Sequence, residues 1–207
     1  RFSTVESWSK NVFNLNTKRA LVEAGGEMEW VSGTFGSKVT MLYPTTILKG
    51  EGAKMEYLGM SLALGEQILD SGAKVICLAD NTSAMIRSKS VAKNGGVSMT
   101  KTLAKVGKGV KGVKAYIDCK SLILDSESRS YAEPMVDVNS GEAEVTHEAS
   151  VGKLSEEILY YLATRGIGEE KAKEILIRGF SEEITKALPL EYAMEMNNLI
   201  KLEMQNM

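Results

Sequence analysis

The feature that most constrains the fold is one short pattern that recurs through the first three quarters of the chain. A glycine or asparagine turn is followed by a small or polar residue and then by apolar residues that alternate with polar ones. This alternation predicts half-buried β-strands of about four to six residues. Copies of the pattern begin at Gly25, Gly36, Gly52, Gly72, Asn81, Gly95 and Gly141, with a weaker copy from Gly107.

The spacing of these copies excludes an alternation of strands and helices. The first six copies start 11, 16, 20, 9 and 14 residues apart, and no helical pattern lies between them. Many short strands with glycine and asparagine turns are typical of a sandwich, a barrel or a solenoid. Because one signature recurs, we favour a β-solenoid whose coils stack about 4.8 Å apart, with a β-sandwich as the alternative.

A change in glycine content marks a boundary near residues 152–155. Sixteen of the 19 glycines lie between Gly25 and Gly152, and apolar residues after that point recur at helical spacing. We therefore predict a β-solenoid core over residues 1–154 and a helical domain over residues 155–207. The expected helices are Ser155–Arg165, Glu169–Arg178, a short helix from Ser181 to before Pro189, and Leu190–Gln205, with Ser155 and Ser181 as amino-terminal caps. We expect this acidic helical domain to cover the open edge of the last coil.

Composition narrows the function. The chain has 207 residues and a net charge of −2, which argues against a dedicated nucleic-acid binder. It contains no apolar run of about 18 residues, so we expect no membrane span. Nine lysines and arginines fall between Arg87 and Lys120, but only Tyr116 is interleaved with them, which favours a solvated face over a nucleic-acid platform. Because the chain begins at Arg1, we expect a fragment of a longer protein.

Two cysteines are too few for a disulfide framework, so we expect reduced thiols in a cytoplasmic protein. The alternation around Cys77 predicts a core residue. For Cys119, two hypotheses stand. It is either a small buried residue, or a thiolate that accepts sulfur or binds iron, with Lys114 and Lys120 lowering its pKa.

The single histidine, His147, excludes mechanisms that need two histidines in one chain. It shares a strand face with small and apolar residues, which is typical of a core histidine. As a metal ligand it would need Cys119 and carboxylates as partners. The neighbouring Glu148 points to the other face, so both serve one site only if the strand ends or bulges there.

Several segments resemble the SufB/SufD family, the scaffold proteins of the SUF iron–sulfur cluster assembly system. NVFNLNTKRALV from Asn11 and YPTTILKGEGAKMEYLGMSLA from Tyr43 are similar to family segments. So are KVGKGVKGVKAYIDCKSLIL from Lys105 and the long HEASVGKLSEEILYYLATRGIGEEKAKEILIRGF from His147. The resemblance spans nearly the whole chain in order.

The resemblance implies a right-handed parallel β-helix with flanking helical regions, in agreement with the solenoid prediction. It implies a scaffold, not an enzyme, on which a nascent Fe–S cluster forms where two subunits meet, with sulfur from a cysteine desulfurase. A SufC-type ABC ATPase would dock on the carboxy-terminal helices. Cys119 and Glu148 fall at the positions of the SufB cysteine and glutamate, and His147 falls where the SufD histidine lies.

The chain mixes features of both subunit types. HEA at His147 is similar to SufB, whereas ASVGKL and YYLATRG are closer to SufD. The family's cysteine in the YPSCILKG stretch is Thr46 here, and a further SufB cysteine is replaced around Ser128. This mixture implies a SufBD protein that pairs with itself through its last coils, or a SufB/SufD-type heterodimer. The alternative function is a non-catalytic adaptor of the ATPase, with Cys119 and His147 as core residues.

Overall fold

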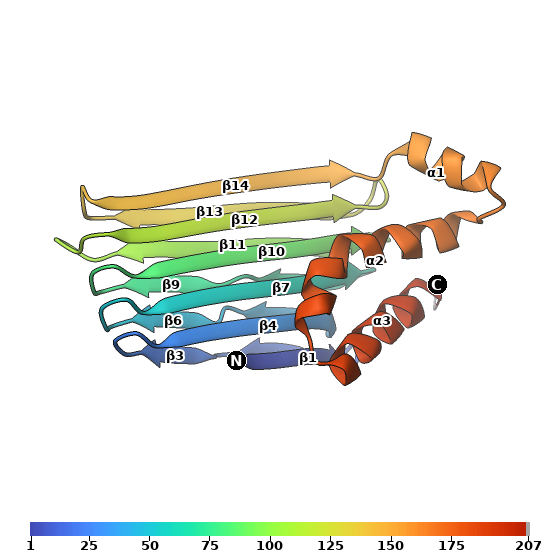
Figure 1. Cartoon of the computed structure of the whole chain (residues 1–207). Helices are drawn as coiled ribbons and strands as arrows, with labels where there is room; N and C mark the ends of the chain where they lie inside the picture. Colours follow the sequence, from blue (N-terminus) through green and yellow to red (C-terminus); the bar gives the residue numbers. More distant parts are fainter. Residues whose placement is uncertain (206–207) are drawn as a thin grey trace.

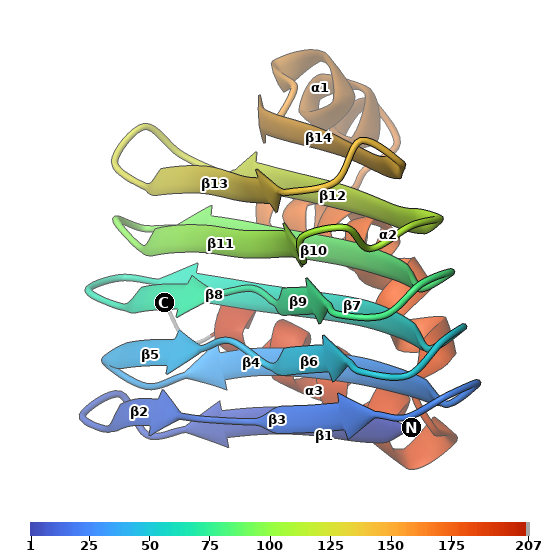
Figure 2. The same cartoon turned by 90° about the vertical axis from the view of Figure 1, so that its left-hand side faces the viewer.

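Two parallel β-sheets stack coil upon coil into a β-solenoid in the computed structural model, which describes residues 1–205 (Figures 1 and 2). The last two residues of the predicted helical domain lie outside that range. Sheet A contains, in order, β1 (Phe2–Trp8), β4 (Glu27–Gly36), β7 (Lys54–Leu64), β10 (Ser83–Lys93), β12 (Val113–Ile123) and β14 (Ala143–Lys153). Sheet B contains β2 (Phe13–Asn16), β3 (Arg19–Val22), β5 (Val39–Leu42), β6 (Thr45–Leu48), β8 (Ile68–Ser71), β9 (Lys74–Cys77), β11 (Val97–Val106) and β13 (Arg129–Val138).

The unequal spacing of the sequence pattern has a simple cause. Copies from Gly25, Gly52 and Asn81 lead into strands of sheet A, whereas those from Gly36, Gly72 and Gly95 lead into strands of sheet B. A long and a short interval therefore add up to one coil of about 30 residues. The solenoid prediction is confirmed, and the sandwich alternative is wrong.

The strands of sheet A are longer than the sequence pattern indicated. β7 has 11 residues instead of the expected four to six. Its apolar side chains Met55 and Tyr57 point inward. Further along, Leu58, Met60, Leu62 and Leu64 point outward, where helices cover the sheet. This change of face interrupts the alternation in the middle of a continuous strand, so the pattern appeared to end early.

The helical segment forms three helices, α1 (Glu156–Thr164), α2 (Glu169–Ala187) and α3 (Leu190–Gln205). The predicted break before Ser181 is wrong, because α2 continues through it and the Ser181 hydroxyl bonds the Arg178 carbonyl inside the helix. Burial of Ile177 and Ile184 against the solenoid holds the two halves in one helix. Ser155 does precede α1, but its side chain makes no capping hydrogen bond.

The helices lie elsewhere than predicted. Instead of covering the edge of the last coil, α2 and α3 run back across the outer face of sheet A to β1 (Figure 1). They bury a second apolar cluster outside the solenoid that includes Phe35, Leu62, Ile177, Met196 and Ile200. Packing on the apolar outer surface of sheet A buries more apolar area than covering the single edge strand β14 would, and the stabilisation scales with the apolar area buried.

Ionic contacts also hold α2 on sheet A. Glu183 pairs with Arg87 at 2.8 Å and with Lys89 at 3.2 Å, and Glu170 pairs with Lys93 at 2.5 Å. Within residues 1–205 the edge strand β14 pairs with β12 alone, so its other side is free. Among residues 1–205, no helix combines the length and the apolar character needed to cross a membrane.

Candidate functional site

Cys119 lies on the inner face of β12, one strand from the end of the solenoid. Its register partners are Ser88 on β10 and Ala149 on β14. The side chain is 0 % exposed and belongs to the core cluster between the sheets. The structure therefore confirms that Cys119 is a buried residue, as is Cys77, and both are free thiols.

The environment of Cys119 favours the protonated thiol. Burial raises the pKa of the Cys119 thiol to about 11, whereas the Thr102 hydroxyl, 4.0 Å from the sulfur, acts in the opposite direction. The expectation that lysines lower this pKa is wrong. Lys120 points to the outer face and pairs with Asp118 at 2.8 Å. Thr102 comes from β11 across the solenoid, a contact for which the sequence carries no local signal.

His147 lies on the same inner face as Cys119, but on the last strand. His147 pairs in register with Ile117, which lies two residues before Cys119 on β12. The Cα atoms of His147 and Cys119 therefore lie diagonally across β12 and β14, about 8 Å apart. The prediction of a core histidine is wrong, because the side chain is exposed. Within residues 1–205 no further strand follows β14, so its inner face packs on the core at Ala143 and Val145 but meets solvent from His147 onward.

Glu148 lies on the outer face of sheet A, away from Cys119. Strand β14 runs without interruption from Ala143 to Lys153, so the bulge that would bring Glu148 to the side of His147 is absent from it. Glu148 instead pairs in register with Asp118 and accepts a hydrogen bond from the Tyr116 hydroxyl. Burial, together with these carboxylates, raises the pKa of Tyr116.

The three predicted ligands do not form a metal site within one chain. In residues 1–205, no group of three or more histidine, cysteine, aspartate or glutamate side chains is placed to hold an ion. Cys119 and His147 share a face, whereas Glu148 faces the other way. A cluster bound by all three would need ligands from a second chain or a rearranged last coil.

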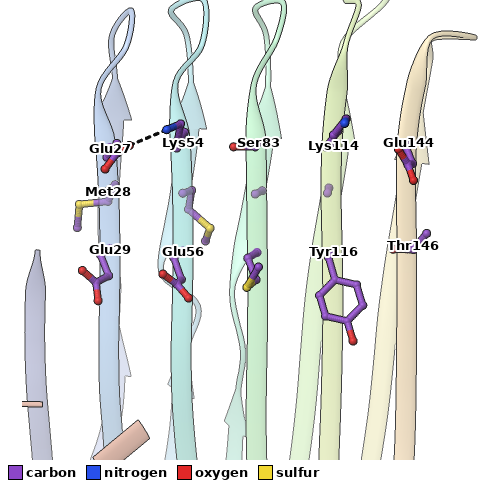
Figure 3. Close-up of a pocket in the computed structure, with 14 residues that line it drawn as sticks. Glu27, Met28, Glu29, Lys54, Glu56, Ser83, Lys114, Tyr116, Glu144 and Thr146 are labelled. Atoms are coloured by element: carbon purple, nitrogen blue, oxygen red, sulfur yellow. Dashed lines mark hydrogen bonds and ion pairs between the residues drawn. The ribbon is translucent and has the colours of Figure 1, made fainter. Parts of the chain in front are cut away.

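A cleft of about 600 Å³ lies on the outer face of sheet A, near the start of its strands (Figure 3). The Glu27–Lys54 ion pair, Glu56 and Tyr116 line it, and neither Cys119 nor His147 does. The cleft borders the candidate site at Tyr116, whose hydroxyl bonds Glu148, and at Thr146, which precedes His147 on β14. It is therefore a surface beside the site and not a chamber that contains it.

The fold and the arrangement of residues define a class of protein, a parallel β-solenoid with carboxy-terminal helices packed on one sheet. Residues 1–180 match the family model described as "SUF system FeS cluster assembly, SufBD core domain". A protein of Staphylococcus epidermidis named "Iron-sulfur cluster assembly SufBD family protein" is 49 % identical over 205 residues. Proteins of the same family name from Staphylococcus aureus and Staphylococcus haemolyticus are equally similar.

The chain therefore belongs to the SufBD family of iron–sulfur cluster assembly proteins. The alignment covers 99 % of this chain but 44 % of each of these relatives, so the chain spans less than half of their length. The resemblance found in the sequence is confirmed.

Proposed function

We propose that this chain is a scaffold subunit on which an iron–sulfur cluster is assembled at the junction of two subunits. Cys119 accepts sulfur, and Cys119, His147 and Glu148 ligate the nascent cluster, which is cargo and not a resident cofactor. The chain itself is not an enzyme in this proposal. One observation carries it: Cys119 and His147 share the inner face of β12 and β14 at the open end of the solenoid.

The shortage of ligands supports a dimer. A metal ion in a cluster takes about four ligands, and one chain offers only three candidates on two faces. The free side of β14 presents unpaired backbone groups, which readily pair with a strand from another chain. A symmetric pairing in this region, between about Lys105 and Ser150, doubles the ligand supply. The partner is a second copy or a SufB/SufD-type subunit.

The sulfur step has a simple balance. The Cys119 thiolate attacks the outer sulfur of a persulfide supplied by a cysteine desulfurase. A new sulfur–sulfur bond forms at Cys119, the old one breaks, and the donor leaves as a thiolate. Because the thiol is buried and protonated, this step requires local opening of the last coil, whose edge strand β14 is held on one side only. We place the reaction in the cytoplasm, where thiols stay reduced.

The carboxy-terminal helices offer a surface for a SufC-type ABC ATPase, which would hydrolyse ATP. Helix α1 has no buried residue, and Ile158, Tyr160 and Tyr161 are exposed on it. Aromatic side chains of this kind are frequent anchors in protein interfaces. Removing the whole tail is a poor test, because α2 and α3 cover apolar sheet surface. Tyr160→Glu on α1 should abolish co-purification with the ATPase. The control, Tyr192→Glu on α3, should still co-purify with it.

A second function follows from the burial of Cys119, namely a non-catalytic adaptor of the ATPase that carries no cluster. Anaerobic reconstitution with iron and sulfide, followed by absorption spectroscopy, separates the two. We expect Cys119→Ser to lose cluster absorption. Cys77→Ser is the matched control, because Cys77 is equally buried but lies outside the proposed site, and it should keep the absorption. Equal cluster yield from Cys119→Ser and the wild type would establish the adaptor instead.

A further inference from the structure

The outer face of sheet B carries a band of apolar side chains, and no element among residues 1–205 covers it. Helices α2 and α3 lie on sheet A, and among residues 1–205 none of the helices crosses sheet B (Figures 1 and 2). Two neighbouring rows of side chains run across its strands from β2 to β13. We call these rows the sheet B strip, represented by Phe13, Leu15, Met41, Ile68, Met99 and Tyr131.

The exposure of the strip is large for aliphatic and aromatic residues. Leu15 is 67 % exposed, Phe13 63 % and Met41 44 %. Single exposed apolar residues need no explanation, but these follow one another in register on adjacent strands. A contiguous patch of this kind, rimmed by polar groups, is typical of an interaction surface.

Cations outnumber acids around the strip, where Arg19, Lys74, Lys101 and Arg129 lie on the same face as the acids Asp70 and Glu133. Asp70, the acid inside it, is already paired with Lys101 at 3.0 Å. Arg19 and Arg129 make no ion pair with any residue between 1 and 205, and Lys74 lies over the ring of Tyr43 with its Nζ atom 4.8 Å from the centroid. A partner that supplies carboxylates beside an apolar surface would match both features of this face.

The molecule already shows how such a face is covered. The outer face of sheet A presents apolar residues beside the cations Arg87, Lys89 and Lys93. Helix α2 covers it by burying Ile177 and Ile184 and by placing Glu183 and Glu170 against those cations. An amphipathic helix with carboxylates along its border is thus the complement of an apolar and cationic sheet face in this fold.

We propose that the sheet B strip is a docking site for an acidic amphipathic helix of a partner protein. The strip crosses five strands, from β2 through β5, β8 and β11 to β13. At about 4.8 Å between strands it is about 19 Å long, which corresponds to about 13 helical residues. The helix lies along the solenoid axis, with apolar residues on Leu15 and Met41 and carboxylates toward Lys74 and Arg19.

The test uses the 207-residue chain and a fluorescent peptide of about 18 residues, built from Leu, Ala and Glu with Leu at helical spacing. We expect saturable binding by fluorescence anisotropy, weakened at least about tenfold by Met41→Glu and by Lys74→Glu. Met194→Glu is the matched control, because Met194 is similarly exposed but lies on α3. It should leave binding unchanged.

Two further peptides sharpen the result. A peptide of the same composition in scrambled order, and one with Lys in place of Glu, should both bind at least about tenfold more weakly. Equal binding of the scrambled peptide, or no effect of either strip variant, would overturn the proposal. Thermal unfolding checks that each variant is folded. If Met41→Glu does not fold, Lys74→Glu still tests the proposal, because it leaves every apolar residue of the strip unchanged.

A second copy of the chain is the competing occupant. Sedimentation of the wild type, Met41→Glu and Met194→Glu distinguishes it. A dimer that dissociates in Met41→Glu alone would show that the strip binds another copy, and the helix proposal would then be wrong. This outcome is separate from pairing through β14, which leaves the strip exposed.

Discussion

The Thr102 hydroxyl lies 4.0 Å from the sulfur of Cys119, although the two residues belong to opposite sheets of the solenoid. The hydroxyl is the one neighbour that lowers the pKa of the buried thiol, against the effect of burial and of Asp118. A group that stabilises the thiolate in this way also suits a sulfur that attacks a persulfide. Thr102 is therefore a positioning residue for Cys119 in the proposed scaffold function.

We predict that Thr102→Val raises the pKa of Cys119 above its value of about 11. Valine keeps the shape of threonine but cannot donate a hydrogen bond to the thiolate, so deprotonation becomes harder. The pH dependence of alkylation of Cys119 in a Cys77→Ser background measures this shift. Thr100→Val is the control, since Thr100 is a neighbouring buried residue on β11. An unchanged profile in Thr102→Val would show that the hydroxyl has no influence on the thiol.

The same thiol makes stability depend on pH. Burial raises its pKa from the ordinary 9.0 to about 11 in the folded chain. Above pH 9 the unfolded chain loses this proton while the folded chain keeps it. The protonated thiol therefore contributes its full stabilisation of the folded chain below pH 9. This contribution, up to about 3 kcal/mol in the free energy of unfolding, is lost as pH rises toward 11. Urea unfolding of the wild type and Cys119→Ala across this range should show their difference in stability shrinking. A constant difference would contradict the prediction.

Much of the fold could be predicted from the sequence because turn residues precede most strands. The strands without a predicted copy of the pattern are β1, β2, β3, β6, β8 and β13. Two of them lie at prolines: β6 follows Pro44, and β13 contains Pro134, which an edge strand tolerates because it need not donate every ladder bond. The continuity of α2 was missed because Gly179 and Ser181 are poor helix residues locally. Only burial against sheet A, a tertiary contact, overrides that preference.

The candidate site was predicted in part. Alternation placed Cys119 and His147 each among the apolar residues of its own strand, and it placed Glu148 on the face opposite to His147; that Cys119 and His147 share one face of the sheet follows only from the register of β12 and β14. It could not show that β14 is the last strand in the stack, which is why His147 is exposed and not in the core. Nor could it show which residue of the opposite sheet meets Cys119, because that depends on how a coil closes.

The contact between α2 and sheet A provides a third prediction. Lys93 has only 5 % of its side chain exposed, and Glu170 neutralises it at 2.5 Å. Glu170→Ala leaves this buried cation without its partner, so we expect a loss of about 1–3 kcal/mol in the free energy of unfolding. Urea unfolding measures this loss. The control is Glu182→Ala, whose pair with Lys186 is exposed on both sides, so its loss should change the free energy of unfolding far less. Equal effects of the two variants would contradict this account of helix docking.

The last prediction separates ligand roles from structural roles at the end of the solenoid. His147 and Glu148 are both exposed, so His147→Ala and Glu148→Ala should each change the free energy of unfolding by less than about 0.5 kcal/mol. Both should lower cluster yield in reconstitution without abolishing it, because water or a free thiol can replace an imidazole or a carboxylate more readily than the sulfur-bearing thiolate. Thermal unfolding and cluster absorbance are measured on the same samples. The control is Glu144→Ala, an exposed acid on the same strand that the proposal leaves out of the cluster. If Glu144→Ala lowers the yield as much as Glu148→Ala, the effect reflects charge at the last coil in general, and Glu148 is not a ligand.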